Sequence, residues 1–223
     1  MLTTLALSAL LAPAAASDLA SSLWHPGAGA MDKGFAYAGT TVLAAADDSF
    51  AGTWVGATAA WAPTRRLSVS GTALVAVGST VVGAGARFNL IESKWFRAGP
   101  VVFGAAWDHT EMESSRSIGG GLGLAVESGF SRVRFDTFVP LVVVTTEAGP
   151  LIPADRLPGF DHWNVGMTVR MGSSHANRIR GGIASGGVSL AYQHVGERWF
   201  METAVTAGVS PAISGSLRGG FVF

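Results

Sequence analysis

The chain contains no cysteine and few charged residues. Without cysteine it can form neither disulfide bonds nor thiolate metal sites. Asp, Glu, Lys and Arg together make up only 13% of 223 residues, and 15 basic residues balance 15 acidic ones. A formal net charge of zero gives no reason to expect nucleic acid as a partner. The mean hydropathy of +0.38 is nevertheless high for a soluble domain.

Long, purely aliphatic runs are also missing. The charge-free window 67–86 is long enough for a transmembrane helix, which takes about 20 residues, but it contains five valines and four glycines. Ser68, Ser70 and Thr72 alternate with apolar or small neighbours. That period is two rather than the 3.6 of a helix. The window therefore predicts a β-hairpin with a tight turn near 78–80.

The same alternation recurs in 81–90, 116–127, 132–143, 162–171 and 199–209. In 162–171, for example, Val165 and Met167 share one face, whereas Gly166 and Arg170 share the other. Large apolar residues thus oppose glycines and charges. A soluble β-barrel that binds an apolar ligand would show the same period with its apolar face inward, so the period predicts strands without fixing their surroundings.

The final segment adds a more specific signal. Leu217, Gly219, Phe221 and Phe223 share one face, and Arg218 lies on the other. A terminal aromatic residue on the apolar face of a last strand resembles the C-terminal signature of bacterial outer-membrane β-barrel proteins. The resemblance implies an all-β fold, a transmembrane antiparallel up-and-down β-barrel. It also implies that Phe221 and Phe223 form an assembly signal and that the partners are the barrel-assembly machinery, outer-membrane lipids and lipopolysaccharide.

The N-terminal residues predict export to the bacterial outer membrane through the periplasm. The segment 5–12 is apolar, and Pro13 and three alanines follow it, so residues 1–16 are expected to be a signal peptide cleaved after Ala16. No Lys or Arg precedes the apolar segment, and a retained N-terminal helix is the alternative. Residues 17–32 are expected to be a periplasmic lead, and residues 33–223 the barrel. Aromatic residues near the predicted strand ends, such as Trp61, Trp95 and Trp199, suit interfacial girdles.

About twelve strands fit the pattern: 33–45, 50–61, 67–77, 81–91, 95–107, 116–127, 131–146, 160–171, 178–184, 187–195, 198–209 and 214–223. An even number returns both termini to the periplasmic side and places the longest connections, 108–115 and 147–158, on the outer side. Ten strands is the alternative, because glycines within 178–195 could mark one bent strand.

The alternation collects charged residues on the inward face of the barrel. An arginine on the lipid face would cost roughly 2–4 kcal/mol at the bilayer midplane. Two interpretations stay open: a pore that prefers anions, because arginines outnumber acids, or ion pairs that brace a narrow lumen. The predicted lumen charge network consists of Arg87, Glu127, Arg132, Arg134, Asp136, Arg170, Glu202 and Arg218.

The sequence thus predicts a small passive pore or a structural surface protein without a cofactor, a metal site or an enzymatic activity. The dipeptides Asp108-His109 and Asp161-His162 leave a hydrolase at the outer rim as an alternative, because an Asp that orients a His can activate water. However, adjacent residues of a strand point to opposite faces, so both members would enter one cleft only if a loop reoriented them.

Overall fold

The computed structural model describes residues 36–46, 51–64, 66–109, 115–130, 132–148, 164–172, 176–184, 187–208 and 213–223. The predicted signal peptide, 1–16, and the predicted lead, 17–32, lie outside these residues. In the part of the chain that is described, no helix has the length and apolar character needed to cross a membrane.

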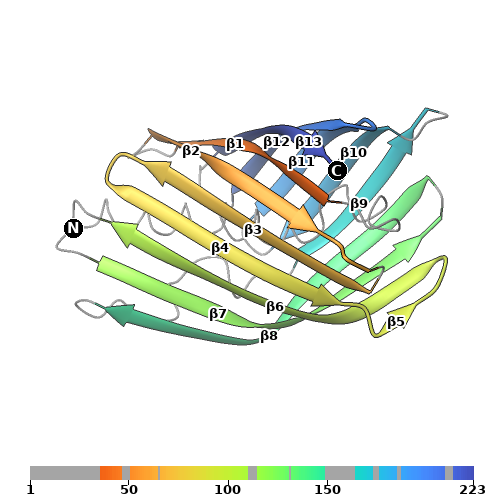
Figure 1. Ribbon diagram of the computed structural model, residues 1–223, viewed down its shortest axis with the longest axis horizontal. Helices are drawn as coiled ribbons and strands as arrows, with labels where there is room; N and C mark the ends of the chain where they lie inside the picture. Colours follow the sequence, from red (N-terminus) through yellow and green to blue (C-terminus); the bar gives the residue numbers. More distant parts are fainter. Residues whose placement is uncertain are drawn as a thin grey trace.

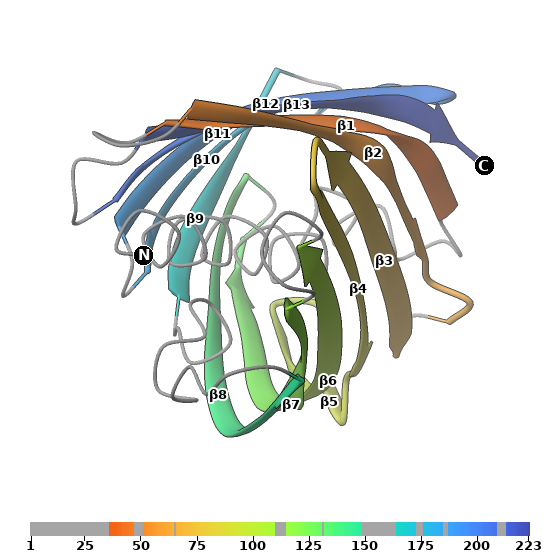
Figure 2. The same cartoon turned by 90° about the vertical axis from the view of Figure 1, so that its left-hand side faces the viewer.

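The described residues form antiparallel strands that close into a barrel (Figures 1 and 2). Each long strand pairs with its neighbours in sequence, β1 pairs with β13, and β4 pairs with β6 to complete the ring. The strands are β1 (Ala36–Ala46), β2 (Ala51–Trp61), β3 (Leu67–Ala76), β4 (Ser79–Phe88), β5 (Ile91–Glu92), β6 (Phe96–His109), β7 (Ser115–Gly129), β8 (Val133–Ala148), β9 (Asn164–Met171), β10 (Asn177–Ala184), β11 (Gly187–Val195), β12 (Trp199–Gly208) and β13 (Ile213–Val222).

The barrel itself has twelve strands, because β5 has only two residues and pairs with β6 alone, beside the wall. This confirms the prediction of twelve strands. The ten-strand alternative is wrong, since β10 and β11 form a hairpin of two separate strands with Ala184 opposite Gly187. The charge-free window 67–86 is the β3–β4 hairpin, as expected. Its two-residue turn is Val77-Gly78, where Gly78 adopts a φ of 68° that a side chain would disfavour.

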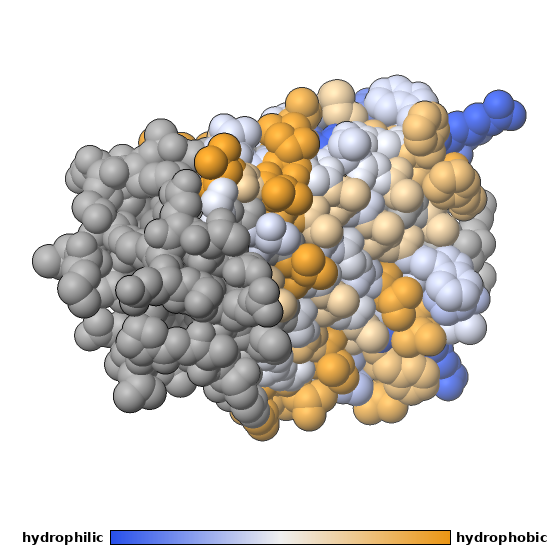
Figure 3. Space-filling view, turned by 60° about the vertical axis from the view of Figure 1, so that its left-hand side comes forward, coloured by the Kyte–Doolittle hydropathy of each residue, from blue (hydrophilic) through white to orange (hydrophobic). Residues whose placement is uncertain are grey.

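Most of the large apolar side chains of the described strands point away from the barrel axis, toward the surroundings. Phe135, Met167 and Leu141 expose 49%, 42% and 67% of their surfaces, and Figure 3 shows apolar and weakly polar residues across the outer wall. A soluble barrel would instead bury these side chains. The outward apolar face therefore confirms the transmembrane orientation and contradicts the soluble alternative.

One irregularity bends the wall. Leu122 of β7 pairs with Val142 of β8, but Gly123 pairs with Pro140, so Leu141 is an extra residue. Pro140 has no amide hydrogen and cannot donate to the ladder, which makes it a natural place for a bulge. The bulge leaves Leu141 and Val142 both exposed to the outside.

The two ends of the barrel differ. Short connections at 62–66, 89–95, 130–132, 172–176 and 196–198 join strands at one end, where the Phe223 amide also donates to the Ala36 carbonyl at 2.8 Å. We call this the short-turn end; β5 marks it on the right of Figure 1. The β3–β4 turn lies at the opposite end, together with the end of β6, the start of β7 and the end of β8, as the strand parity predicts.

Candidate functional site

The charged side chains inside the barrel gather near the short-turn end. They share strand faces with small residues such as Gly99, Gly166 and Ala125, which places them inward, whereas the apolar residues of the same strands face out. We call this set the charged collar. It consists of Arg87, Arg97, Glu127, Arg134, Asp136, Arg170, Arg178, Arg180, Glu202 and Arg218.

Glu127 of β7 is the centre of the first group of ion pairs. Its carboxylate pairs with Arg134 of β8 and lies 3.7 Å from Arg87 Nη1 of β4. The Arg87 Nε also donates a hydrogen bond of 2.8 Å to Asn89 Oδ1. Glu127 and Arg87 are only 5% and 3% exposed. One buried carboxylate therefore holds two guanidinium groups from strands on either side of it.

A second ion pair crosses an intervening strand. Asp136 of β8 pairs with Arg180 of β10, although β9 lies between them. Gly166 of β9 is the residue opposite Asp136. A Cβ atom at Gly166 would lie 2.9 Å from the Asp136 carboxylate and 3.2 Å from Arg180 Nη2. The absence of a side chain at this glycine is what lets the two charged groups meet.

Glu202 of β12 organises the third group. Arg218 Nε of β13 lies 3.7 Å from one of its oxygens, and the Gln193 amide of β11 donates to the other. Gln193 and Arg218 are each 2% exposed. Because moving a charged side chain from water into the protein interior costs free energy, such a group is stable only when its members form hydrogen bonds or ion pairs with one another.

Arg170 of β9 and Arg178 of β10 differ from these pairs. They are directly opposed in the strand register, and neither forms an ion pair with a carboxylate of the described residues. The Nε atoms of both are buried and have no hydrogen-bond partner there. Counted over the described residues, the charged collar holds seven arginines and three carboxylates, an excess of four positive charges.

Seven of the eight residues of the predicted lumen network lie in the charged collar. Arg132 does not: it is exposed in the bend before β8, where its carbonyl accepts a hydrogen bond of 2.8 Å from the Arg170 amide. The strand begins at Val133, so the alternation does not reach Arg132. Sequence reasoning missed Arg97, Arg178 and Arg180, although Arg178 and Arg180 share a face with Gly182 in a predicted strand.

The remaining sequence-derived candidates are placed as follows. Phe221 and Phe223 are 67% and 77% exposed at the short-turn end, and their role as an assembly signal stays a prediction. Asp108 and His109 are the last residues of β6, and Asp161-His162 lies outside the described residues. Within the described residues, no group of three or more acidic or His side chains could hold a metal ion.

Beyond the collar, one side of the barrel interior is filled by aromatic rings. The Phe103 and Phe138 rings meet edge to face, with centroids 5.6 Å apart. Both pack on glycines of β7: a Cβ atom at Gly123 would lie 2.3 Å from Phe138 Cε2, and one at Gly121 would lie 3.0 Å from the Phe103 ring. Side chains from β6 and β8 therefore occupy the space that the β7 glycines leave free.

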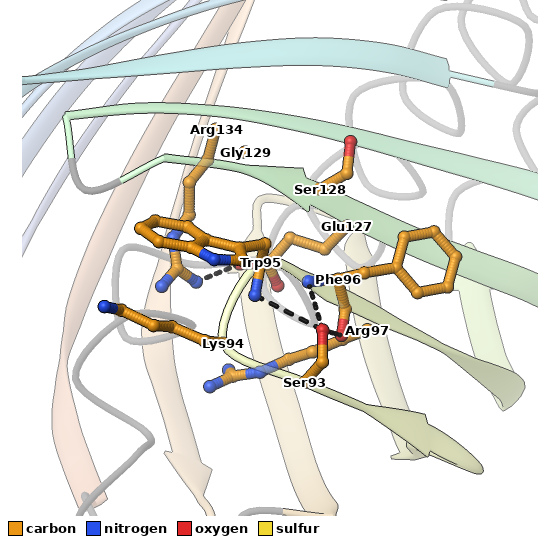
Figure 4. A pocket seen from close by; sticks show the side chains of 9 residues that line it. All are labelled: Ser93, Lys94, Trp95, Phe96, Arg97, Glu127, Ser128, Gly129 and Arg134. Carbon is orange, nitrogen blue, oxygen red and sulfur yellow. Dashed lines mark hydrogen bonds and ion pairs between the residues drawn. The ribbon is translucent and has the colours of Figure 1, made fainter.

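At the short-turn end the collar borders a small hollow (Figure 4). The β5–β6 turn forms one wall, where Ser93 Oγ accepts hydrogen bonds from the amides of Trp95 and Phe96 at 3.3 and 3.0 Å. Glu127 and Arg134 form the opposite wall. The ion pair at the centre of the collar therefore borders this hollow, although Glu127 itself is only 5% exposed.

No protein-family model and no curated protein sequence matches the chain. Among solved structures, the KdgM porin in complex with disordered oligogalacturonate superposes with a TM-score of 0.58 at 9% identity, over 83% of this chain and 99% of that one. A second structure of the KdgM porin gives a TM-score of 0.56 with the same identity and coverage. The translocator domain of the autotransporter NalP from Neisseria meningitidis gives 0.47 at 12% identity, over 93% and 92%. The chain has the fold of an outer-membrane β-barrel.

Proposed function

We propose that the chain is a passive channel of the bacterial outer membrane that favours anions. The observation that carries the proposal is the excess of arginines over carboxylates in the charged collar. Rings of fixed charge inside a pore raise the local concentration of counter-ions and repel ions of the same sign. The surplus guanidinium groups would therefore admit small anions more readily than cations.

The placement of the collar supports this role. Its residues come from eight of the twelve strands, β4, β6 to β10, β12 and β13, so a solute that passes along the axis meets charge from several directions. Low-dielectric walls strengthen such a field relative to bulk water. The outward apolar residues suit a bilayer, which supports an outer-membrane location.

We infer the class of permeating solute from the charges of this chain's own collar. The KdgM porin structure contains oligogalacturonate, a chain of sugars that carry carboxylates. At 9% identity the likeness concerns the fold alone. Small carboxylated or phosphorylated solutes are nevertheless the class that a surplus of arginines would favour.

Ion selectivity in planar bilayers tests the proposal. The wild-type protein in a KCl gradient should give a reversal potential of the sign that chloride permeation produces. Arg170→Glu together with Arg178→Glu removes two positive charges and adds two negative ones, which lowers the net charge by four and cancels the surplus, so the anion preference should disappear. Arg132→Glu makes the same change of charge per residue at an exposed position and should leave the preference in place.

Cation selectivity of the wild-type protein would contradict the anion preference, and the absence of conductance from a correctly folded barrel would contradict the channel itself. A second candidate, a structural surface barrel, is favoured by the dense ion pairing of Glu127 with Arg87 and Arg134. A folded barrel without conductance would support that function instead. Neither function needs an enzymatic site.

A further inference from the structure

The five strands β9 to β13 carry one continuous row of inward polar residues, which ends at Arg218, opposite Thr41 of β1. Along the strand register, Arg170 is opposite Arg178, Arg178 opposite Gln193, Gln193 opposite Glu202, and Glu202 opposite Arg218. The row contains three arginines and one carboxylate. Glu202 is already engaged by Gln193 and Arg218. The row therefore lacks a counter-charge at its Arg170–Arg178 end.

The Arg170–Arg178 pair is unfavourable as it stands. Like charges directly opposite each other destabilise a strand pair, and Arg178 is only 7% exposed. A buried guanidinium group without a partner carries a large desolvation penalty. Three buried polar atoms in this region, Arg170 Nε, Arg178 Nε and Gln193 Oε1, have no hydrogen-bond partner among the described residues.

We propose that Arg170 and Arg178 form a binding site for a small oxyanion, such as a phosphate or a carboxylate group. Opposed residues on neighbouring strands have Cα atoms about 4.5–5.5 Å apart, so two guanidinium groups can engage the oxygens of one anion between them. Planar guanidinium groups match the paired oxygens of phosphates and carboxylates. The anion would supply the ion-pair partner that the described residues do not provide for these two arginines.

This inference deepens the proposed channel, because it names the place where a permeating anion would bind. The neighbouring arginines do not compete for the role: Arg134 and Arg180 already pair with Glu127 and Asp136. The site is therefore specific to two side chains, and neutral substitution of either one removes half of it.

Thermal stability with inorganic phosphate tests the site without reference to conduction. The full-length protein is folded in a non-ionic detergent without lipid, so free phosphate is the sole source of phosphate groups. The midpoint of heat unfolding is followed on gels by the loss of the folded band. Phosphate at about ten times its dissociation constant should raise the midpoint by about 2–5 °C over chloride at equal ionic strength.

Arg178→Gln should abolish the phosphate effect and, without phosphate, should leave the midpoint equal or higher, because the repulsion between the two arginines is gone. Arg170→Gln, at a less buried position, should behave in the same way and serves if Arg178→Gln does not fold. Arg132→Gln, in the exposed bend, should retain the full phosphate effect.

The site is overturned if phosphate does not raise the midpoint of the wild-type protein, or if both substitutions keep the full effect. If both variants had a lower midpoint without phosphate, and phosphate had no effect on the wild-type protein, the two arginines would instead stabilise the barrel structure itself. These results are independent of the bilayer recordings: a barrel that conducts anions without this stabilisation loses only the binding site.

Discussion

Replacing Glu127 by Gln is the sharpest test of how the collar is held together. The substitution keeps the shape of the side chain and removes the charge that two arginines share. Arg87 lies 3.7 Å from the carboxylate and is 3% exposed, and Arg134 pairs with the other oxygen. Both guanidinium groups would remain in place without this counter-charge.

The expected loss is about 3–5 kcal/mol in the free energy of unfolding, the range for removing one partner of a buried ion pair. A matched control is Glu92→Gln. Glu92 lies 4.0 Å from Arg66, whose side chain is 65% exposed, so this pair is screened by water. The control should cost at most about 0–1 kcal/mol.

Urea unfolding of the barrel in lipid vesicles, followed by tryptophan fluorescence, measures both variants. In addition, the double variant with Arg134→Gln and Glu127→Gln should lose less free energy of unfolding than the two single variants together. The reason is that interacting residues of this kind are coupled by about 0.5–3 kcal/mol. If Glu127→Gln cost no more than Glu92→Gln, water would have to screen Glu127, and the argument from burial would be refuted.

Two further predictions concern the wall and its assembly. Val102→Arg, on the outward face in the middle of β6, should destabilise the inserted barrel by about 2–4 kcal/mol. The control Val77→Arg, at a 92% exposed turn position, should cost little. Equal losses in the free energy of unfolding, measured in vesicles, would argue against a lipid-facing wall. Deletion of Phe223 should lower the fraction of heat-modifiable, membrane-inserted protein in cells, and normal insertion would count against a role of the terminal aromatic residue in assembly.

Strand positions and faces could be predicted because one period governs the whole wall. Alternation assigned Met167 outward and Asp136 inward, and the structure places both as expected. The same period failed at strand ends. Arg132 has the parity of Arg134, but the chain bends there and frees its side chain from the pattern.

Contacts between strands could not be predicted in the same way. The Asp136–Arg180 pair joins residues 44 positions apart, and it depends on the tilt of the strands and on the missing side chain at Gly166. Likewise, the packing of Phe138 on Gly123 requires the register of β7 and β8, which a bulge shifts at this point. A pattern along one strand contains none of this information.

The crowding of charge at the short-turn end gives the proposed channel a direction. An ion that entered there would meet the charged collar at once, whereas one from the opposite mouth would first pass the level of Trp54, Leu74 and Phe103, whose side chains are buried. Under a membrane voltage of one polarity, chloride would enter the proposed channel at the short-turn end, beside the charged collar. Under the other polarity, chloride would enter at the opposite end and pass the apolar half before it reached the collar. The proposed channel would therefore rectify: currents of opposite sign would differ in size even between identical salt solutions.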